Sequence, residues 1–132
     1  MLAAALKRKP HHVPVLLRLA QLSSESGNSV QAAAHLKEIL QYEPDNADAR
    51  LELGKALFES GDVRGAIEHT SKILERNPAH PDALYNLGAI YANIGNHTRA
   101  RECWMRLISS NPQAESSVRA SRMLTQLSKD SF

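Results

Sequence analysis

The sequence has 132 residues, the usual length of one domain, and a formal net charge of +2 at pH 7. Because this charge is close to zero and the basic residues are dispersed, a general nucleic-acid-binding surface is not indicated. No stretch of 18 apolar residues is present, so no membrane-spanning helix is predicted, and the single cysteine, Cys103, excludes an intrachain disulfide.

The first ten residues, 1–10, are predicted to form a partial helix. An apolar run is followed by the basic run Lys7-Arg8-Lys9 and then by proline. This proline is the first of four that are spaced 34 residues apart, at Pro10, Pro44, Pro78 and Pro112. The segment therefore has the pattern of the end of a second helix from a preceding repeat, which leads to the hypothesis that the chain is part of a longer array. The alternative is a short natural N-terminal helix.

Residues 13–112 are predicted to contain three helical hairpins, because the 34-residue period indicates one supersecondary unit in three copies. The predicted boundaries are 13–46, 47–80 and 81–112. Within each half of a hairpin, apolar residues recur at intervals of three and four, which is the helical period. No useful stretch alternates with a period of two, so no strands are predicted.

The turns inside the hairpins share a glycine followed by asparagine or aspartate, at Gly27-Asn28, Gly61-Asp62 and Gly95-Asn96. We expect the glycine to end the first helix in the left-handed conformation. The polar side chain should then cap the second helix by accepting from its free backbone N–H groups. Each later proline is expected one or two residues beyond the second helix, which it cannot continue.

The 34-residue unit resembles the tetratricopeptide repeat. The third unit carries the resemblance best, at Leu84, Leu87, Gly88, Tyr91, Ala100, Trp104, Leu107 and Pro112. The second unit departs from the family pattern with Arg50 at the first large position and Thr70 at the aromatic position, and the first unit has Ala20 for the glycine and Ser23 for the tyrosine. The resemblance implies an all-α fold, a right-handed α-α superhelix (solenoid) of helical hairpins.

Residues 113–132 are predicted to form a C-terminal capping helix, because a terminal repeat would otherwise expose an apolar face. Its apolar stripe consists of Ala120, Met123, Leu124 and Leu127, and its polar face of Arg119, Arg122, Gln126 and Lys129. The apolar stripe aligns with the core stripe of the repeats only if the loop after Pro112 is two residues longer than the other loops. A longer loop is therefore expected there.

The resemblance implies that the first helices of the hairpins line a concave groove. Off the core stripe, these helices carry an apolar column, Leu17, Leu51 and Tyr85, where a solvated surface would more often be polar. Such a strip, edged by polar residues, suits an extended peptide or an amphipathic helix. The predicted partner-binding residues are Leu17, Gln21, Leu51, Lys55, Phe58, Tyr85, Asn86 and Asn93. The alternative is that these side chains pack between neighbouring first helices or under the capping helix.

Chaperone adaptors of this family clamp a C-terminal carboxylate with Lys and Asn in the first repeat and Lys and Arg in the third. The matching positions in this chain hold Leu17, Gln21, Asp82 and Asn86. The resemblance therefore does not imply a carboxylate clamp, because none of these four side chains is basic.

No catalytic, cofactor or metal site is predicted. His35, His69 and Cys103 occupy one column of the repeats, on second helices about 10 Å apart. A transition metal needs its ligand atoms about 2.0–2.3 Å away, and three side chains on helices this far apart cannot all reach one ion. We therefore interpret the three residues as outward-facing side chains. The sequence has no glycine-rich phosphate loop and no nucleophile motif. The chain is therefore predicted not to be an enzyme.

The predicted function is non-enzymatic binding of a protein or peptide in the groove, as a scaffold or assembly adaptor. Two alternatives are a structural spacer or self-association module, and the regulatory array of a larger enzyme. The apolar run precedes the basic run at the N-terminus, the reverse of a secretory signal. A cytoplasmic location is favoured, and the periplasm stays open if the chain is a fragment.

Overall fold

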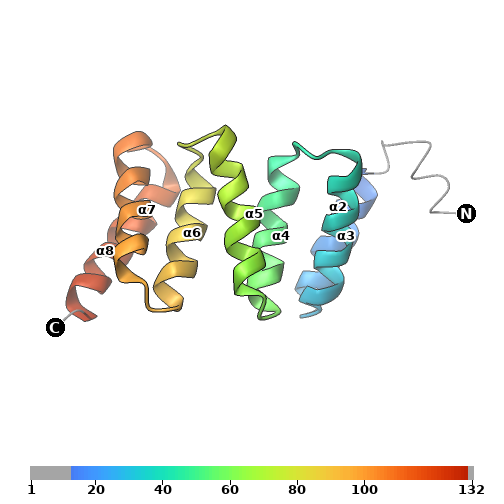
Figure 1. Cartoon of the computed structure of the whole chain (residues 1–132), viewed down its shortest axis with the longest axis horizontal. Helices are drawn as coiled ribbons and strands as arrows, with labels where there is room; N and C mark the ends of the chain where they lie inside the picture. Colours follow the sequence, from blue (N-terminus) through green and yellow to red (C-terminus); the bar gives the residue numbers. More distant parts are fainter. Residues whose placement is uncertain (1–12, 131–132) are drawn as a thin grey trace, which may run out of the picture. The chain divides into compact units, whose positions relative to one another are not determined.

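The computed structural model describes residues 13–130, and every regular element in this range is an α-helix (Figure 1). The helices are α2 (Val13–Glu25), α3 (Ser29–Tyr42), α4 (Ala47–Glu59), α5 (Val63–Arg76), α6 (Pro81–Asn93), α7 (His97–Ser110) and α8 (Glu115–Asp130). The predicted all-α fold class is confirmed. The partial helix predicted for residues 1–10 lies outside the described residues, and the repeat boundaries stay a prediction.

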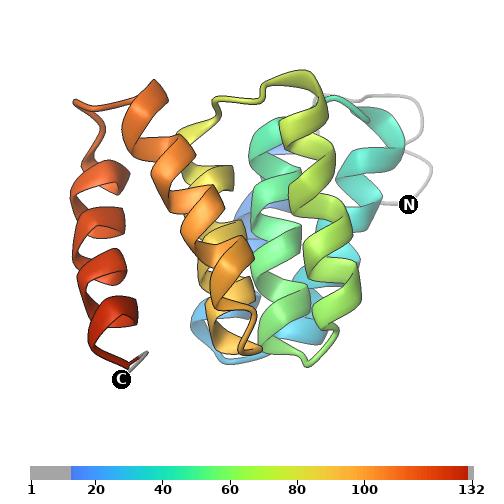
Figure 2. The same ribbon diagram turned by 60° about the vertical axis from the view of Figure 1, so that its left-hand side comes forward.

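The chain divides into two compact units, one ending at His69 and the other beginning at Thr70, so that α5 contributes to both. In the first unit, α3 packs against both α2 and α4. In the second unit, α7 packs against α6 and α8, and α8 also contacts α6. Figure 2 shows α8 beside α7, the helix that precedes it.

The turns inside the hairpins have the expected geometry. Gly27, Gly61 and Gly95 have φ angles of 79°, 95° and 86°, the left-handed region that glycine enters without a steric penalty. The residue after each glycine donates its backbone N–H to the carbonyl five residues earlier at 2.8 Å, which completes a Schellman motif. The same residues, Asn28, Asp62 and Asn96, accept a backbone N–H in the first turn of the next helix at 3.1, 2.9 and 3.2 Å. The predicted caps are confirmed.

The loop before α8 corrects the sequence-based expectation. Residues 111–114 separate α7 from α8, and loops of the same length, 43–46 and 77–80, precede α4 and α6. The loop after Pro112 is therefore not longer than the others. Instead, α8 turns inward a face different from that of α4 and α6: Ala120 and Leu127 are buried, while Ser121 and Arg122, at the positions of Leu87 and Gly88, are exposed. The Ser117 hydroxyl is buried as well and donates to the carbonyls of Asn111 and Leu107 at the end of α7.

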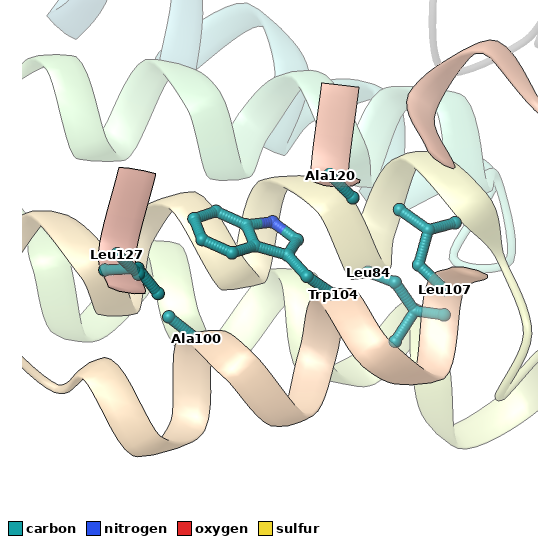
Figure 3. Close-up of a cluster of buried hydrophobic side chains, with 6 residues drawn as sticks. All are labelled: Leu84, Ala100, Trp104, Leu107, Ala120 and Leu127. Atoms are coloured by element: carbon teal, nitrogen blue, oxygen red, sulfur yellow. The ribbon is translucent and has the colours of Figure 1, made fainter. Parts of the chain in front are cut away.

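The core of the second unit is a cluster of six buried apolar side chains from α6, α7 and α8, drawn in Figure 3: Leu84, Ala100, Trp104, Leu107, Ala120 and Leu127. Met123 and Leu124 of α8 pack against this cluster. The side chains predicted for the polar face of α8 are exposed. Burying one stripe of an amphipathic helix while leaving the other in water is what stabilises such a helix on its neighbours.

Trp104 lies at the centre of this cluster and is fully buried. Its indole Nε1–H donates to the backbone carbonyl of Tyr85 at 3.1 Å, so the one polar atom of the ring is satisfied. The ring also lies directly over Gly88, where a Cβ atom would stand 2.7 Å from Cδ1 of the indole. The glycine therefore permits the close approach of α6 and α7.

Candidate functional site

Five of the predicted partner-binding residues lie in the first unit. Leu17 and Gln21 are one turn apart on α2, and Leu51, Lys55 and Phe58 follow one another along one face of α4. The three apolar side chains are half-buried, while the glutamine and the lysine are exposed. The two helices therefore present an apolar surface with polar side chains beside it, and its role in binding stays a prediction.

A shallow depression of about 170 Å³, open to solvent, lies among α2, α3 and α4. It is lined by Leu17, Ala20, Gln21, Ser24, Leu36 and Glu52. Ala20 and Leu36 are buried and supply its apolar base, and Gln21 and Ser24 are exposed at its rim. The structure thus brings two of the predicted residues, Leu17 and Gln21, to one depression. Much of this volume is open solvent, and the space that the centre of a water-sized sphere can occupy is only about 10 Å³, enough for a group about the size of a methyl.

One ion pair borders this depression. Lys55 Nζ lies 3.7 Å from Glu52 Oε1, and the two side chains are 51% and 38% exposed. An exposed pair three residues apart on a helix contributes little to stability, because water screens it and both side chains lose rotamer freedom. Each charge therefore remains accessible to a bound partner. Glu52 was not among the predicted residues, although it lies one repeat period before Asn86, which was.

The other three predicted residues, Tyr85, Asn86 and Asn93, lie on α6 in the second unit. The Tyr85 ring is half-buried, and its centroid lies 6.3 Å from that of Trp104 with an angle of 36° between the ring planes. Tyr85, Ala89 and Ala92 all pack against the cluster to which α8 contributes. Part of their apolar surface therefore belongs to the core, as the packing alternative expected, whereas Asn93 is exposed.

The structure also explains why Arg50 departs from the repeat pattern, which has a large apolar residue at this position. Its Nη1 lies 2.9 Å from Nδ1 of His69, and its Nη2 donates to the carbonyl of Pro44 at 2.9 Å. A guanidinium can only donate, so Nδ1 accepts and the neutral imidazole carries its proton on Nε2. His69 is half-buried and held by this contact, which corrects its interpretation as a plain surface imidazole. The sequence showed Arg50 only as an exception to the repeat pattern.

Cys103, the third residue of the His35 column, is half-buried as well. Burial raises the pKa of its thiol from the ordinary 9.0 to about 11, and the charge of Glu102 acts in the same direction, while Arg106 and Arg99 oppose it. The reactive form of a thiol is the thiolate. At neutral pH the Cys103 side chain is therefore protonated and a poor nucleophile.

We expect Cys103 of the folded protein to react with iodoacetamide about a hundredfold more slowly at pH 7.5 than the same thiol after unfolding in urea. The factor follows from the rise of the thiol pKa from 9.0 to about 11. Below its pKa, a thiol loses about nine tenths of its thiolate form each time the pKa rises by one. The rate for the folded protein should keep rising until the pH approaches 11. Mass spectrometry of the alkylated chain measures both rates, and equal rates at pH 7.5 would contradict the raised pKa.

Within residues 13–130, no three or more His, Cys, Asp or Glu side chains are grouped so as to hold a metal ion. None of the helices in the described part of the chain is both long and apolar enough to cross a membrane.

Two family models match the sequence, and both describe the tetratricopeptide repeat. One matches residues 25–75 and the other residues 51–115, so together they span more than half of the chain. A search of curated proteins gives no significant match.

Solved structures show the same fold. A crystal structure of MamA is 28% identical over 93% of this chain and 74% of its own, with a TM-score of 0.72. YrrB, described as a TPR protein with an unusual peptide-binding site, is 23% identical over 83% of this chain and 57% of its own, with a TM-score of 0.74. The first TPR of Spaghetti (RPAP3), bound to an HSP90 peptide, is 15% identical over 90% of this chain and 94% of its own, with a TM-score of 0.76.

Proposed function

Because this chain belongs to the tetratricopeptide repeat family, a fold of protein-interaction modules, we propose that it binds a partner protein through the surface of α2 and α4. The family is generally non-catalytic, which supports a binding role over an enzymatic one. The proposed ligand is an extended segment of the partner that places one small apolar side chain in the depression among α2, α3 and α4.

The composition of the depression carries this proposal. Its base is apolar, from Ala20 and Leu36, and its rim holds the exposed amide of Gln21. An extended peptide has backbone N–H and C=O groups without partners, and a glutamine amide can both donate to and accept from them. A small apolar side chain at the base would leave water at the same time, which adds a non-directional contribution to affinity.

The accessible charges at the rim suggest which peptides would bind best. Glu52 offers a carboxylate beside the depression, and its contact with Lys55 is exposed and weak. A basic residue of the partner next to the small apolar one could pair with Glu52. The affinity of such a peptide should fall as salt concentration rises, because salt screens exposed charges.

The structural neighbours support a peptide ligand without naming one. YrrB has an unusual peptide-binding site, and the Spaghetti TPR is bound to an HSP90 peptide. At 23% and 15% sequence identity, these two proteins share the fold with this chain, and their ligands are not carried over to it. The positions of the carboxylate clamp hold no basic residue in this chain, at Leu17, Gln21, Asp82 and Asn86. We therefore expect recognition of an internal segment rather than of a C-terminal carboxylate.

The proposal can be tested with linear peptides selected from a randomised phage-displayed library on the full chain. Gln21→Ala should weaken the binding of the selected peptides by about three- to tenfold, the effect of one lost hydrogen bond. Gln41→Ala is the matched control, since Gln41 is also exposed but lies on α3 outside the depression. Fluorescence polarisation gives each dissociation constant, and circular dichroism confirms that both variants fold.

Equal dissociation constants for Gln21→Ala, Gln41→Ala and the unchanged protein would place the peptide site elsewhere. Glu52→Gln removes the negative charge at the rim but keeps nearly the same side-chain shape, so it tests the charge alone. If Glu52 pairs with a basic residue, this variant should lose the salt dependence of binding together with part of the affinity. A peptide that binds Glu52→Gln with the same affinity and the same salt dependence would remove the ionic contact from the proposal.

A further inference from the structure

The depth of the depression among α2, α3 and α4 is set by two buried side chains. Ala20 and Leu36 form its base and are 2% and 1% exposed. The methyl group of Ala20 is attached directly to the backbone, so no rotamer moves it aside, and Leu36 is held in place by core packing. Gln21 and Ser24 are exposed at the rim, where their side chains can adjust to a ligand. The base is therefore the rigid part of the site.

The 34-residue period shows why space remains at this place. Ala20 stands two periods before Gly88, and a Cβ at Gly88 would lie 2.7 Å from Cδ1 of Trp104. The indole therefore fills all the space beside that glycine. Leu36 stands two periods before Trp104 and is the smaller side chain. Around Leu36, the methyl group of Ala20 fills only part of the difference, and the depression is the part that stays open.

The open part of the depression has the size and polarity for one amino acid. Its space for the centre of a water-sized sphere is about 10 Å³, which a single methyl group fills. Alanine is the residue whose side chain is one methyl group. Serine is similar in size, but its hydroxyl would lose hydrogen bonds to water against the apolar base formed by Ala20 and Leu36.

We propose that the depression selects alanine in the bound segment, and that the Ala20 methyl group is the part of the site that excludes a longer side chain. This inference rests on the proposed function, because it assigns the residue that enters the same site. That residue of the partner is called the anchor residue below. The accessible carboxylate of Glu52 at the rim favours lysine or arginine beside the anchor. The partner is thus a protein with an extended internal segment in which an alanine neighbours a basic residue.

The test uses the peptides that are selected from the library on the unchanged chain and are weakened by Gln21→Ala. They should share an alanine next to lysine or arginine. The tightest of them is synthesised with glycine, alanine or 2-aminobutyrate at this position, and fluorescence polarisation gives the dissociation constants. On the unchanged chain, glycine should weaken binding by about three- to fivefold, the effect of one buried methyl group. The additional methyl group of 2-aminobutyrate should weaken binding as well, because it meets Ala20.

Ala20→Gly should reverse this preference, so that the 2-aminobutyrate peptide binds about threefold more tightly than the alanine peptide. Glycine already occupies the same position of the period at Gly54 of α4 and Gly88 of α6, so helices of this chain accommodate it there. Ala34→Gly is the matched control, since it makes the same substitution at an exposed position of α3 that does not line the depression. This variant should keep the preference for alanine, and circular dichroism verifies that both variants are helical.

Three results would overturn this inference while the proposed function stands. The first is selected peptides that are weakened by Gln21→Ala but share a leucine or an aromatic residue instead of alanine. The second is an unchanged preference for alanine in the Ala20→Gly variant. The third is a reversed preference in Ala34→Gly as well, because the cause would then be a more flexible helix. If Gln21→Ala weakened none of the selected peptides, the proposed function itself would fail, and this inference with it.

Discussion

Replacing Trp104 with alanine is expected to lower the free energy of unfolding by about 3–5 kcal/mol. The indole is fully buried among side chains from α6, α7 and α8, and it is the largest of the fully buried side chains in the described part of the chain. Truncation removes its apolar contacts and leaves a cavity that the rigid helices can close only in part. It also removes the hydrogen bond from Nε1 to the carbonyl of Tyr85.

Urea denaturation followed by far-UV circular dichroism measures this effect, since the variant has no tryptophan left for fluorescence. Met105→Ala is a suitable control. The next residue along α7 is 53% exposed, so its truncation should change the stability by no more than about 0.5 kcal/mol. A loss below about 1 kcal/mol for Trp104→Ala would mean that the indole does not hold the three helices together.

Gly88→Ala should destabilise the protein by about 1–3 kcal/mol, although alanine is the better helix former by about 1 kcal/mol. A Cβ at this position would stand 2.7 Å from Cδ1 and 2.8 Å from Cε2 of Trp104, well inside normal contact distance. The indole cannot move away cheaply, because it is fully buried and hydrogen-bonded to α6. Overpacking should therefore outweigh the gain in helix propensity.

A double-mutant cycle separates the two contributions. In a Trp104→Ala background, the space beside residue 88 is empty, so Gly88→Ala should be neutral or stabilising by up to about 1 kcal/mol. Gly65→Ala is the contrasting variant, because its Cβ would meet the Asp62 carboxylate, which is exposed and can rotate away from the Cβ at the cost of its cap hydrogen bond to the residue 65 N–H. If Gly88→Ala cost the same in both backgrounds, the contact with Trp104 would not be its cause.

These two predictions also change how the candidate surface should be probed. Tyr85 contacts Trp104 through its ring and accepts the indole hydrogen bond through its carbonyl. Truncating Tyr85 would therefore disturb the core as well as any bound partner. Gln21 is exposed at the rim of the depression, so its substitution reports on binding without a large effect on stability.

The elements that the sequence predicted well depend on neighbours along the chain. The left-handed glycines, the asparagine and aspartate caps and the prolines beyond the second helices are all set within a few residues. For example, Asn28 accepts from Gln31 only three residues away. Such contacts form in any chain with that local sequence, and they were visible before the helices were placed.

The features that the sequence did not predict depend on residues from different helices. Arg50 and His69 meet across a separation of 19 residues, and Arg50 is an exception to the repeat pattern that predicted the other contacts. The predicted apolar stripe of α8 is buried, but the loop before this helix was predicted to be two residues too long, because the stripe was expected to align with the core stripe of the repeats. In α8, Ser117 is buried and hydrogen-bonded, so a polar residue occupies a core position that an apolar pattern does not reveal.

The sequence by itself determined that this chain is a set of helical hairpins with a 34-residue period, because helical periodicity, capping and turn geometry are local. It did not determine whether a further face of each helix, beside its core stripe, is also covered. Val15 and Ala49 occupy the same position of the repeat, yet one is 48% exposed and the other fully buried. Only the tertiary structure decided this difference, because burial depends on whether a neighbouring helix lies against that face.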